Sequence, residues 1–198
     1  MQQLLDPSPP LGLFPQFVAQ QQMTLVLKEK VLTWSGEDFS VKDQWGSVVV
    51  RCEGKLFSIS DQKKFVDASG NHVFTLKNKI WHIHKTMEAE DLAGNVILKL
   101  RGKIQLFGST MNITFTNFAD NREVELVCKG DWIGRKATIA RSDTNQIVAQ
   151  IGRNFLNARE IFAGAETYQV NVAPGVDLAL IAAICIALNE RNRESQGR

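Results

Sequence analysis

Cationic side chains recur every 24 residues in three segments that alternate apolar and polar residues. In the segment VILKLRGKI (96–104), Lys99, Arg101 and Lys103 share one face, because successive side chains of a strand point to opposite sides. The corresponding positions of all three segments, which we call the basic stripe, are Arg51, Glu53, Lys55, Thr75, Lys77, Lys79, Lys99, Arg101 and Lys103. They hold seven cations and one anion, a net charge of +6 (7 − 1), in a chain whose formal net charge is only +2.

The basic stripe predicts a surface that binds anionic phospholipid headgroups. Each Lys or Arg near an anionic membrane contributes about 1 kcal/mol of attraction. The candidate headgroup-binding residues are therefore Arg51, Lys55, Lys77, Lys79, Lys99, Arg101 and Lys103. Two interpretations compete with this one: a solvated outer face whose lysines protect strand edges, and a surface for protein or nucleic acid. The nearly neutral net charge gives no support for nucleic acid as a partner.

Two further clusters have residue types that can bind metals. His82 and His84 place two imidazoles on one face of a strand, a spacing that can chelate zinc, but the sequence identifies no third ligand. Glu88, Glu90 and Asp91 crowd one turn, yet they lack the ligand spacing of a calcium-binding EF-hand loop. We therefore expect solvent-facing histidines and no metal site.

The sequence contains none of the common catalytic motifs. There is no Gly-x-Ser-x-Gly elbow, no phosphate-binding glycine loop and no His-Glu-x-x-His helix. Cys52 and Cys128 lie at apolar positions of alternating segments, and Cys185 lies inside an apolar run, so all three read as buried hydrophobic residues. We expect a non-enzymatic protein with no cofactor, in a reducing, intracellular compartment.

A 24-residue repeat indicates which elements position the basic stripe. The tetrapeptide Asp-x-x-Gly occurs at 43–46, 67–70 and 91–94, and each copy precedes one of the three stripe segments. Asp bonds local backbone and Gly accepts a positive φ, so each tetrapeptide predicts a turn. The rest of the chain continues with short β-rich segments, and we count roughly ten to twelve strands in all, a number typical of a sandwich or barrel.

The C-terminal region contains one segment with no polar face. The residues from Leu178 to Leu188 are eleven consecutive apolar residues. As a helix they span about 16 Å, which is too short for a hydrocarbon core of about 30 Å. A helix that is apolar all round is normally buried inside a protein, so we expect a central helix over about 176–191. Its predicted core residues are Leu178, Leu180, Ile181, Ile184, Cys185 and Leu188.

The N-terminal region differs in composition from the rest of the chain. Four of the five prolines fall within the first fifteen residues, and no basic segment of a secretory signal is present. We expect a flexible or extended arm over residues 1–22, a barrel domain over 23–192 and a disordered tail over 193–198. Disorder of the arm and its attachment to the domain through Leu13, Phe14 and Phe17 both remain open.

Four blocks of the sequence resemble a known family. They are DASGNHVFTLKNKIWHIH (67–84), KGDW (129–132), IVAQIGRN (147–154) and YQVNVAPGVDLALIAAICIALNE (168–190). The chain resembles the Tubby C-terminal-like fold, and within it the LURP-one-related group, which is related to the phospholipid scramblases. The resemblance implies a mainly β fold: a closed antiparallel β-barrel of about 12 strands that encloses a hydrophobic C-terminal α-helix. Members of the wider superfamily are linked to phosphoinositide binding or lipid scrambling.

The family resemblance and the basic stripe together favour an adaptor domain that docks on membranes through anionic phospholipids such as phosphoinositides. The alternatives are lipid translocation of the scramblase type and a protein-binding scaffold without a lipid ligand. We expect an intracellular protein, cytoplasmic or peripheral to a membrane, that is not secreted and has no transmembrane helix. The sequence makes no prediction of the oligomeric state.

Overall fold

The computed structural model describes residues 3–28, 39–54, 62–79, 86–104, 109–131, 136–152 and 167–196. Apart from one short 3-10 helix, these residues form twelve strands followed by an α-helix. The elements are η1 (Pro15–Phe17), β1 (Met23–Lys28), β2 (Phe39–Asp43), β3 (Val48–Gly54), β4 (Gln62–Val66), β5 (His72–Lys79), β6 (Thr86–Glu90), β7 (Val96–Ile104), β8 (Ser109–Thr116), β9 (Glu123–Asp131), β10 (Lys136–Arg141), β11 (Ile147–Gly152), β12 (Thr167–Val172) and α1 (Leu178–Gln196). The mainly β fold with a C-terminal helix is therefore confirmed.

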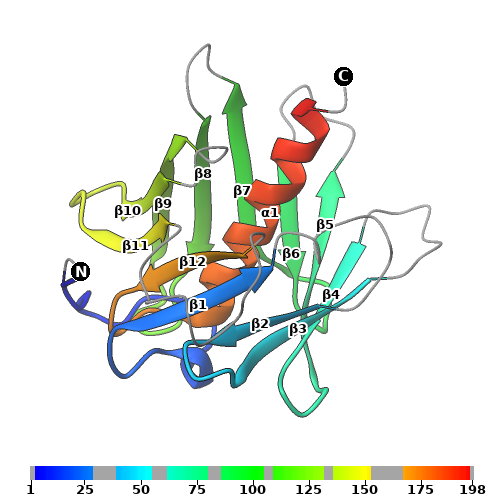
Figure 1. Ribbon diagram of the computed structural model, residues 1–198, viewed down its shortest axis with the longest axis horizontal. Coiled ribbons are helices and arrows are strands. Elements are labelled where there is room, and N and C mark those ends of the chain that lie inside the picture. The colour runs from blue at the N-terminus through cyan, green and yellow to red at the C-terminus, as the bar shows by residue number, and fades with distance from the viewer. Residues whose placement is uncertain are drawn as a thin grey trace.

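The twelve strands form one closed antiparallel barrel. Each strand pairs with its neighbours in the chain, and β1 closes the sheet by pairing with β12 from Met23↔Val172 to Lys28↔Thr167. In Figure 1 the strands surround α1 on its different sides. Closure leaves the sheet without an exposed edge, which removes the risk of edge-to-edge aggregation. The predicted barrel of about 12 strands is confirmed.

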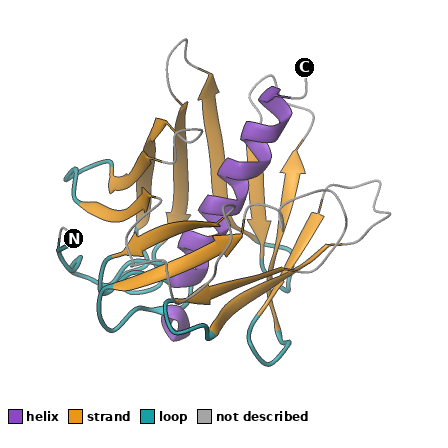
Figure 2. Ribbon diagram, in the orientation of Figure 1, coloured by secondary structure: helices purple, strands orange, loops and turns teal. Residues whose placement is uncertain are grey.

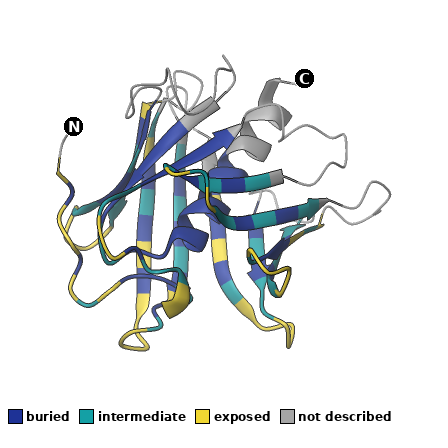
Figure 3. Ribbon diagram, turned by 60° about the horizontal axis from the view of Figure 1, so that its bottom comes forward, coloured by how far each residue is buried: buried dark blue, intermediate teal, exposed yellow. Residues whose placement is uncertain are grey.

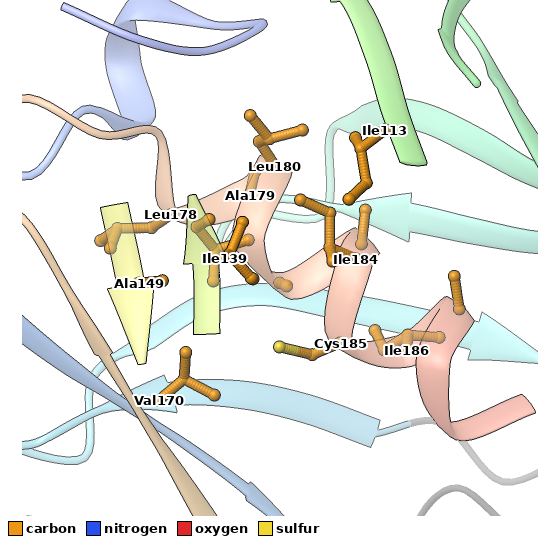
Figure 4. Packing of buried hydrophobic residues seen from close by; sticks show 14 of the residues in the cluster. Ile113, Ile139, Ala149, Val170, Leu178, Ala179, Leu180, Ile184, Cys185 and Ile186 are labelled. Carbon is orange, nitrogen blue, oxygen red and sulfur yellow. The ribbon is translucent and has the colours of Figure 1, made fainter. Parts of the chain in front are cut away.

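The central helix is buried on all of its sides. Every residue from Leu178 to Leu188 has a relative exposure of 8 % or less, and the six residues predicted as its core lie within this stretch. Figure 4 shows Ile113, Ile139 and Val170 directed at the helix from β8, β10 and β12. The six large aliphatic side chains in this stretch contribute about 9–18 kcal/mol at about 1.5–3 kcal/mol each, an upper estimate. Burial all round explains why the segment has no polar face.

The helix continues beyond the end expected from the sequence. It runs to Gln196 instead of ending near residue 191, so residues 193–196 are helical. Glu, Arg and Gln are good helix formers, and the sequence places its next glycine at Gly197. Within the described residues, no helix is both long enough and apolar enough to cross a membrane.

The three Asp-x-x-Gly tetrapeptides form the predicted turns at one end of the barrel. In each, one carboxylate oxygen of Asp accepts hydrogen bonds from the N–H groups two and four residues later, at 2.8–2.9 Å. The glycines at 46, 70 and 94 have φ of +87°, +90° and +86°, a region that residues with a Cβ rarely adopt. Figure 3 shows exposed turns at this end of the barrel.

The N-terminal arm, residues 3–22, lies against the same end of the barrel, next to the start of α1. Leu11 forms a parallel bridge with Val176, and Val18 forms an antiparallel bridge with Asp177. Phe14 stacks on Phe74 of β5 with ring centroids 6.1 Å apart. The loops at this end are teal in Figure 2, and the arm is the blue segment that precedes β1 in Figure 1.

Candidate functional site

The three segments of the basic stripe are not adjacent in the barrel. They form β3, β5 and β7, but β4 lies between the first two and β6 lies between the last two. Neighbouring strands are about 4.8 Å apart, so equivalent stripe positions are separated by about 10 Å. The charge on this outer face therefore depends on β4 and β6 as much as on the stripe itself.

β6 neutralises the middle of the basic stripe. Glu90 forms an ion pair with Lys77, and Lys79 lies 3.6 Å from Glu88 and 3.7 Å from Glu90. The hydrogen bond from Lys77 is the main cause that lowers the pKa of Glu90 below its usual value. The net charge of +6 at the nine stripe positions is therefore larger than the charge of this outer face, because the barrel places Glu88 and Glu90 beside the lysines.

Arg51 is also engaged by the protein itself. Its Nη2 donates a hydrogen bond of 3.0 Å to the carbonyl oxygen of Ala68, in the turn between β4 and β5. Its Nε is buried and has no hydrogen-bond partner. On the neighbouring strand, Lys64 pairs with Glu53 at 3.1 Å. The hydrogen bond to Ala68 gives Arg51 a role in holding the turn, and this role competes with any role in binding a ligand.

The two stripe cations on β7, Lys99 and Arg101, are more exposed than the stripe cations on β3 and β5. Both are exposed, and neither side chain has a hydrogen bond or an ion pair with another described residue. Lys99 lies opposite Glu88 and Thr114 in the sheet register, whereas Arg101 lies opposite Thr86 and Asn112. These two side chains are therefore available to an anion in solution or at a surface.

A cation on β9 that the stripe did not include lies two strands from β7, on the same outer face. Lys129 is exposed and faces Thr110 of β8, which in turn lies opposite Lys103 of β7. Sequence analysis missed Lys129 because it falls outside the 24-residue repeat. The alternation in EVELVCKGD (123–131) nevertheless predicts that Lys129 lies on the outer face of its strand and Cys128 on the inner face. We call Lys99, Arg101 and Lys129 the β7–β9 cation group.

Several predicted positions fall outside the described residues. Lys55, His82 and His84 lie there, and the described part of Lys103 is limited to its backbone in β7. Among the described residues no three His, Cys, Asp or Glu side chains are arranged to hold a metal ion. Asp91 uses its carboxylate within its own turn, and Glu88 and Glu90 contact lysines, so these three acids are engaged by the protein itself.

A second polar cluster lies where α1 begins. The carboxylate of Asp177 is fully buried and accepts four backbone N–H groups: from Leu13 and Phe14 at 2.9 Å, from Ala179 at 2.8 Å and from Leu180 at 3.2 Å. Burial raises the pKa of Asp177 to about 6, and the N–H groups offset part of this effect. The sequence around Asp177 gives no sign of its contact with the arm.

The cysteines are buried free thiols. Cys52, Cys128 and Cys185 lie on the inner faces of β3 and β9 and on α1, and none of them forms a disulfide. Burial raises the pKa of Cys128 to about 12, so this thiol stays protonated at neutral pH. Protonated, buried thiols are poor nucleophiles.

Comparison with known proteins gives a consistent result over nearly the whole chain. A family model described as LURP-one-related matches residues 23–189. Protein LURP-one-related 10 of Arabidopsis thaliana is 28 % identical over 186 residues, which cover 91 % of this chain and 95 % of that protein. Protein LURP-one-related 15 of the same plant is 24 % identical, over 92 % of this chain and 86 % of that protein.

An X-ray structure of another Arabidopsis thaliana protein is similar in fold. It superposes with a TM-score of 0.62 at 19 % sequence identity, over 90 % of this chain and 96 % of that one. At this identity the similarity supports the barrel architecture alone.

Proposed function

The chain belongs to the LURP-one-related family, and we propose that it is a non-enzymatic, intracellular adaptor that docks on anionic phospholipid surfaces such as those containing phosphoinositides. The observation that carries the proposal is the β7–β9 cation group, in which the exposed side chains of Lys99 and Arg101 have no partner among the described residues, and Lys129 is exposed on the same outer face of the barrel. The family resemblance to phosphoinositide-binding folds motivates the choice of lipid.

The expected affinity is modest. Three cations at about 1 kcal/mol each give about 3 kcal/mol, or roughly a 150-fold increase in partition to an anionic surface. The interaction is also screened by salt, because the Debye length falls to about 8 Å at physiological ionic strength. Docking of this strength suits a peripheral, reversible adaptor that uses a second contact for stable attachment.

Vesicle flotation tests the proposal. The protein is mixed with neutral vesicles and with vesicles containing phosphoinositide, each at low and at physiological salt. We expect binding only to the anionic vesicles, with a loss at higher salt. The double variant Lys99→Ala/Arg101→Ala should lower the partition coefficient about 30-fold, from about 2 kcal/mol of lost attraction.

A charge-matched control separates a local site from net charge. Lys64→Ala/Arg122→Ala removes two exposed cations that lie outside the β7–β9 cation group, on β4 and in the turn before β9. This variant should bind within about 2-fold of the wild type. Equal, negligible binding of the wild type to both kinds of vesicle would remove the proposal, and equal losses in the two variants would remove the assigned site.

A further inference from the structure

The arm is held at the end of the barrel mainly through its backbone. The N–H of Leu11 donates to the carbonyl of Gly175 at 2.8 Å, and its carbonyl accepts the N–H of Asp177 at 2.9 Å. Further along the arm, the N–H of Ala19 donates to the carbonyl of Val176 at 3.0 Å, and its carbonyl accepts the N–H of Gly175 at 2.7 Å. The segment that precedes α1 therefore binds two stretches of the arm in an extended, strand-like manner.

Asn117, after β8, binds the first stretch of the arm on both sides of Leu11. Its Oδ1 accepts the N–H of Gly12 at 2.9 Å, and its Nδ2 donates to the carbonyl of Pro10 at 3.1 Å. The neighbouring Phe118 donates its N–H to the carbonyl of Gly12 at 3.0 Å. Asn117 is itself 1 % exposed, so it is a buried polar side chain directed at the backbone of the arm.

The contacts also select among side chains. A Cβ on Gly12 would lie 2.1 Å from Cβ of Asp177, so this position accepts only glycine. Leu11 is fully buried, and the ring of Phe14 stacks on Phe74. The sequence that fits is an extended segment of the pattern apolar–Gly–x–aromatic.

The sheet closes without the arm, although Leu4, Leu11 and Ala19 of the arm are buried in the hydrophobic core. β1 and β12 close the sheet through six residue pairs of their own, and the arm adds only isolated bridges to Val176 and Asp177. Oδ1 of Asp177 caps α1 through Ala179 and Leu180, whereas Oδ2 accepts only from the arm. The arm therefore occupies a site that the rest of the chain forms, instead of forming part of the closure.

Backbone hydrogen bonds that supply affinity, combined with side-chain positions that supply selectivity, are the physical basis of extended-peptide recognition. We propose that this end of the barrel is a binding site for an extended peptide of the pattern apolar–Gly–x–aromatic, and that the N-terminal arm is a built-in occupant which a partner segment of the same pattern displaces. The site is separate from the β7–β9 cation group and goes beyond the proposed docking on lipid.

The test uses the full-length chain with Gly12→Ala, whose own arm cannot seat against Asp177. A fluorescent synthetic peptide with the sequence of residues 8–20, SPPLGLFPQFVAQ, is titrated against this variant and against the wild type, and anisotropy is measured. We expect saturable binding to the variant and at least 10-fold weaker binding to the wild type, because a tethered arm competes at an effective concentration of about millimolar.

Two peptide variants provide matched controls. The peptide with Gly12→Ala should lose at least 10-fold in affinity, whereas the peptide with Gln16→Ala, at an exposed position, should bind like the parent. The proposal is overturned if the Gly12→Ala chain folds but does not bind the parent peptide. It is also overturned if the Gly12→Ala and Gln16→Ala peptides bind with equal affinity.

A measurement on the wild type covers the case in which the Gly12→Ala chain does not fold. Native-state hydrogen exchange should show that the N–H groups of Leu11, Leu13 and Phe14 exchange through local opening, at least 10-fold faster than those in the middle of α1. Exchange of these arm N–H groups only through global unfolding would show that the arm does not leave its site, and would overturn the proposal.

Discussion

A scan around the circumference of α1 tests its enclosure directly. Ile181, Ala182, Ala183 and Ile184 follow one another at about 100° per residue, so together they face almost every direction around the helix axis. All four have a relative exposure of 0 %. A helix packed on the outside of a barrel would have at least one of these positions directed at solvent.

The expected magnitudes follow from packing. Ile181→Ala and Ile184→Ala each remove a buried aliphatic side chain, which costs about 2–5 kcal/mol of unfolding free energy. Ala182→Leu and Ala183→Leu add volume to a filled interior, which costs about 1–3 kcal/mol. If Ile181 or Ile184 lay on an exposed face, its replacement by alanine would change the unfolding free energy by no more than about 0.5 kcal/mol.

The assay is urea unfolding followed by circular dichroism, with the midpoint and the slope fitted for each variant. Leu92→Ala is the control, because Leu92 is a large apolar side chain that is 73 % exposed in a turn. It should stay within about 0.5 kcal/mol of the wild type. The reasoning is refuted if any one of the four helix positions tolerates its substitution as well as the control does.

Three further outcomes are expected. Because burial raises the pKa of Asp177 to about 6, from a usual value of 3.8, the folded state holds this proton more tightly than the unfolded state. The contribution of Asp177 to stability should thus fall by about 2 kcal/mol as the pH rises from about 4 to about 7. Urea midpoints across this range should show a steeper fall for the wild type than for Asp177→Asn, and parallel curves would contradict the assignment. Gly94→Ala should cost about 1 kcal/mol in the same assay, whereas Gly94→Asn should cost less, because Asn121 and Asn145 already occupy positive φ in this protein; equal losses would argue against a conformational cause. Ile184→Asp should abolish the cooperative thermal transition, since it buries an unpaired charge, and a retained transition near the wild-type midpoint would speak against burial.

The hairpins and the enclosed helix were predictable because their signals are local and periodic, whereas the choice of a closed barrel over a sandwich came from the family resemblance. An apolar segment with no polar face, too short to span a bilayer, has to be enclosed by protein. The 24-residue repeat of Asp-x-x-Gly turns gave the hairpins that enclose it, and the structure bears out both the turns and their positive-φ glycines.

The candidate site was less predictable, because its electrostatics depend on pairing across strands. The repeat aligned Lys77 and Lys79 with the other stripe cations, but it gave no register for the strand between them. Glu88 and Glu90 on that strand contact these two lysines, and this leaves Lys99 and Arg101 as the exposed pair. Charge patterns in one strand are therefore informative only when the neighbouring strand is known.

The contact between the arm and the helix was not predictable from sequence at all. Asp177 bonds to Leu13 and Phe14 across 164 and 163 residues of chain. Proline content predicted a flexible or extended arm, and it left both disorder and attachment through Leu13, Phe14 and Phe17 open. The pattern Leu11–Gly12 carried no signal of a buried partner. Only the close approach of Gly12 to Asp177 shows why a glycine stands at that position.

The most direct test of the central helix uses the three native thiols as reporters. Cys185 lies on α1, and Cys52 and Cys128 lie on the strand faces that surround it; all three are buried. Titration of the unmodified native protein with a chromogenic disulfide reagent should label none of them within minutes, and addition of denaturant should release all three. Rapid labelling of Cys185 in the native protein would contradict a helix enclosed by the barrel.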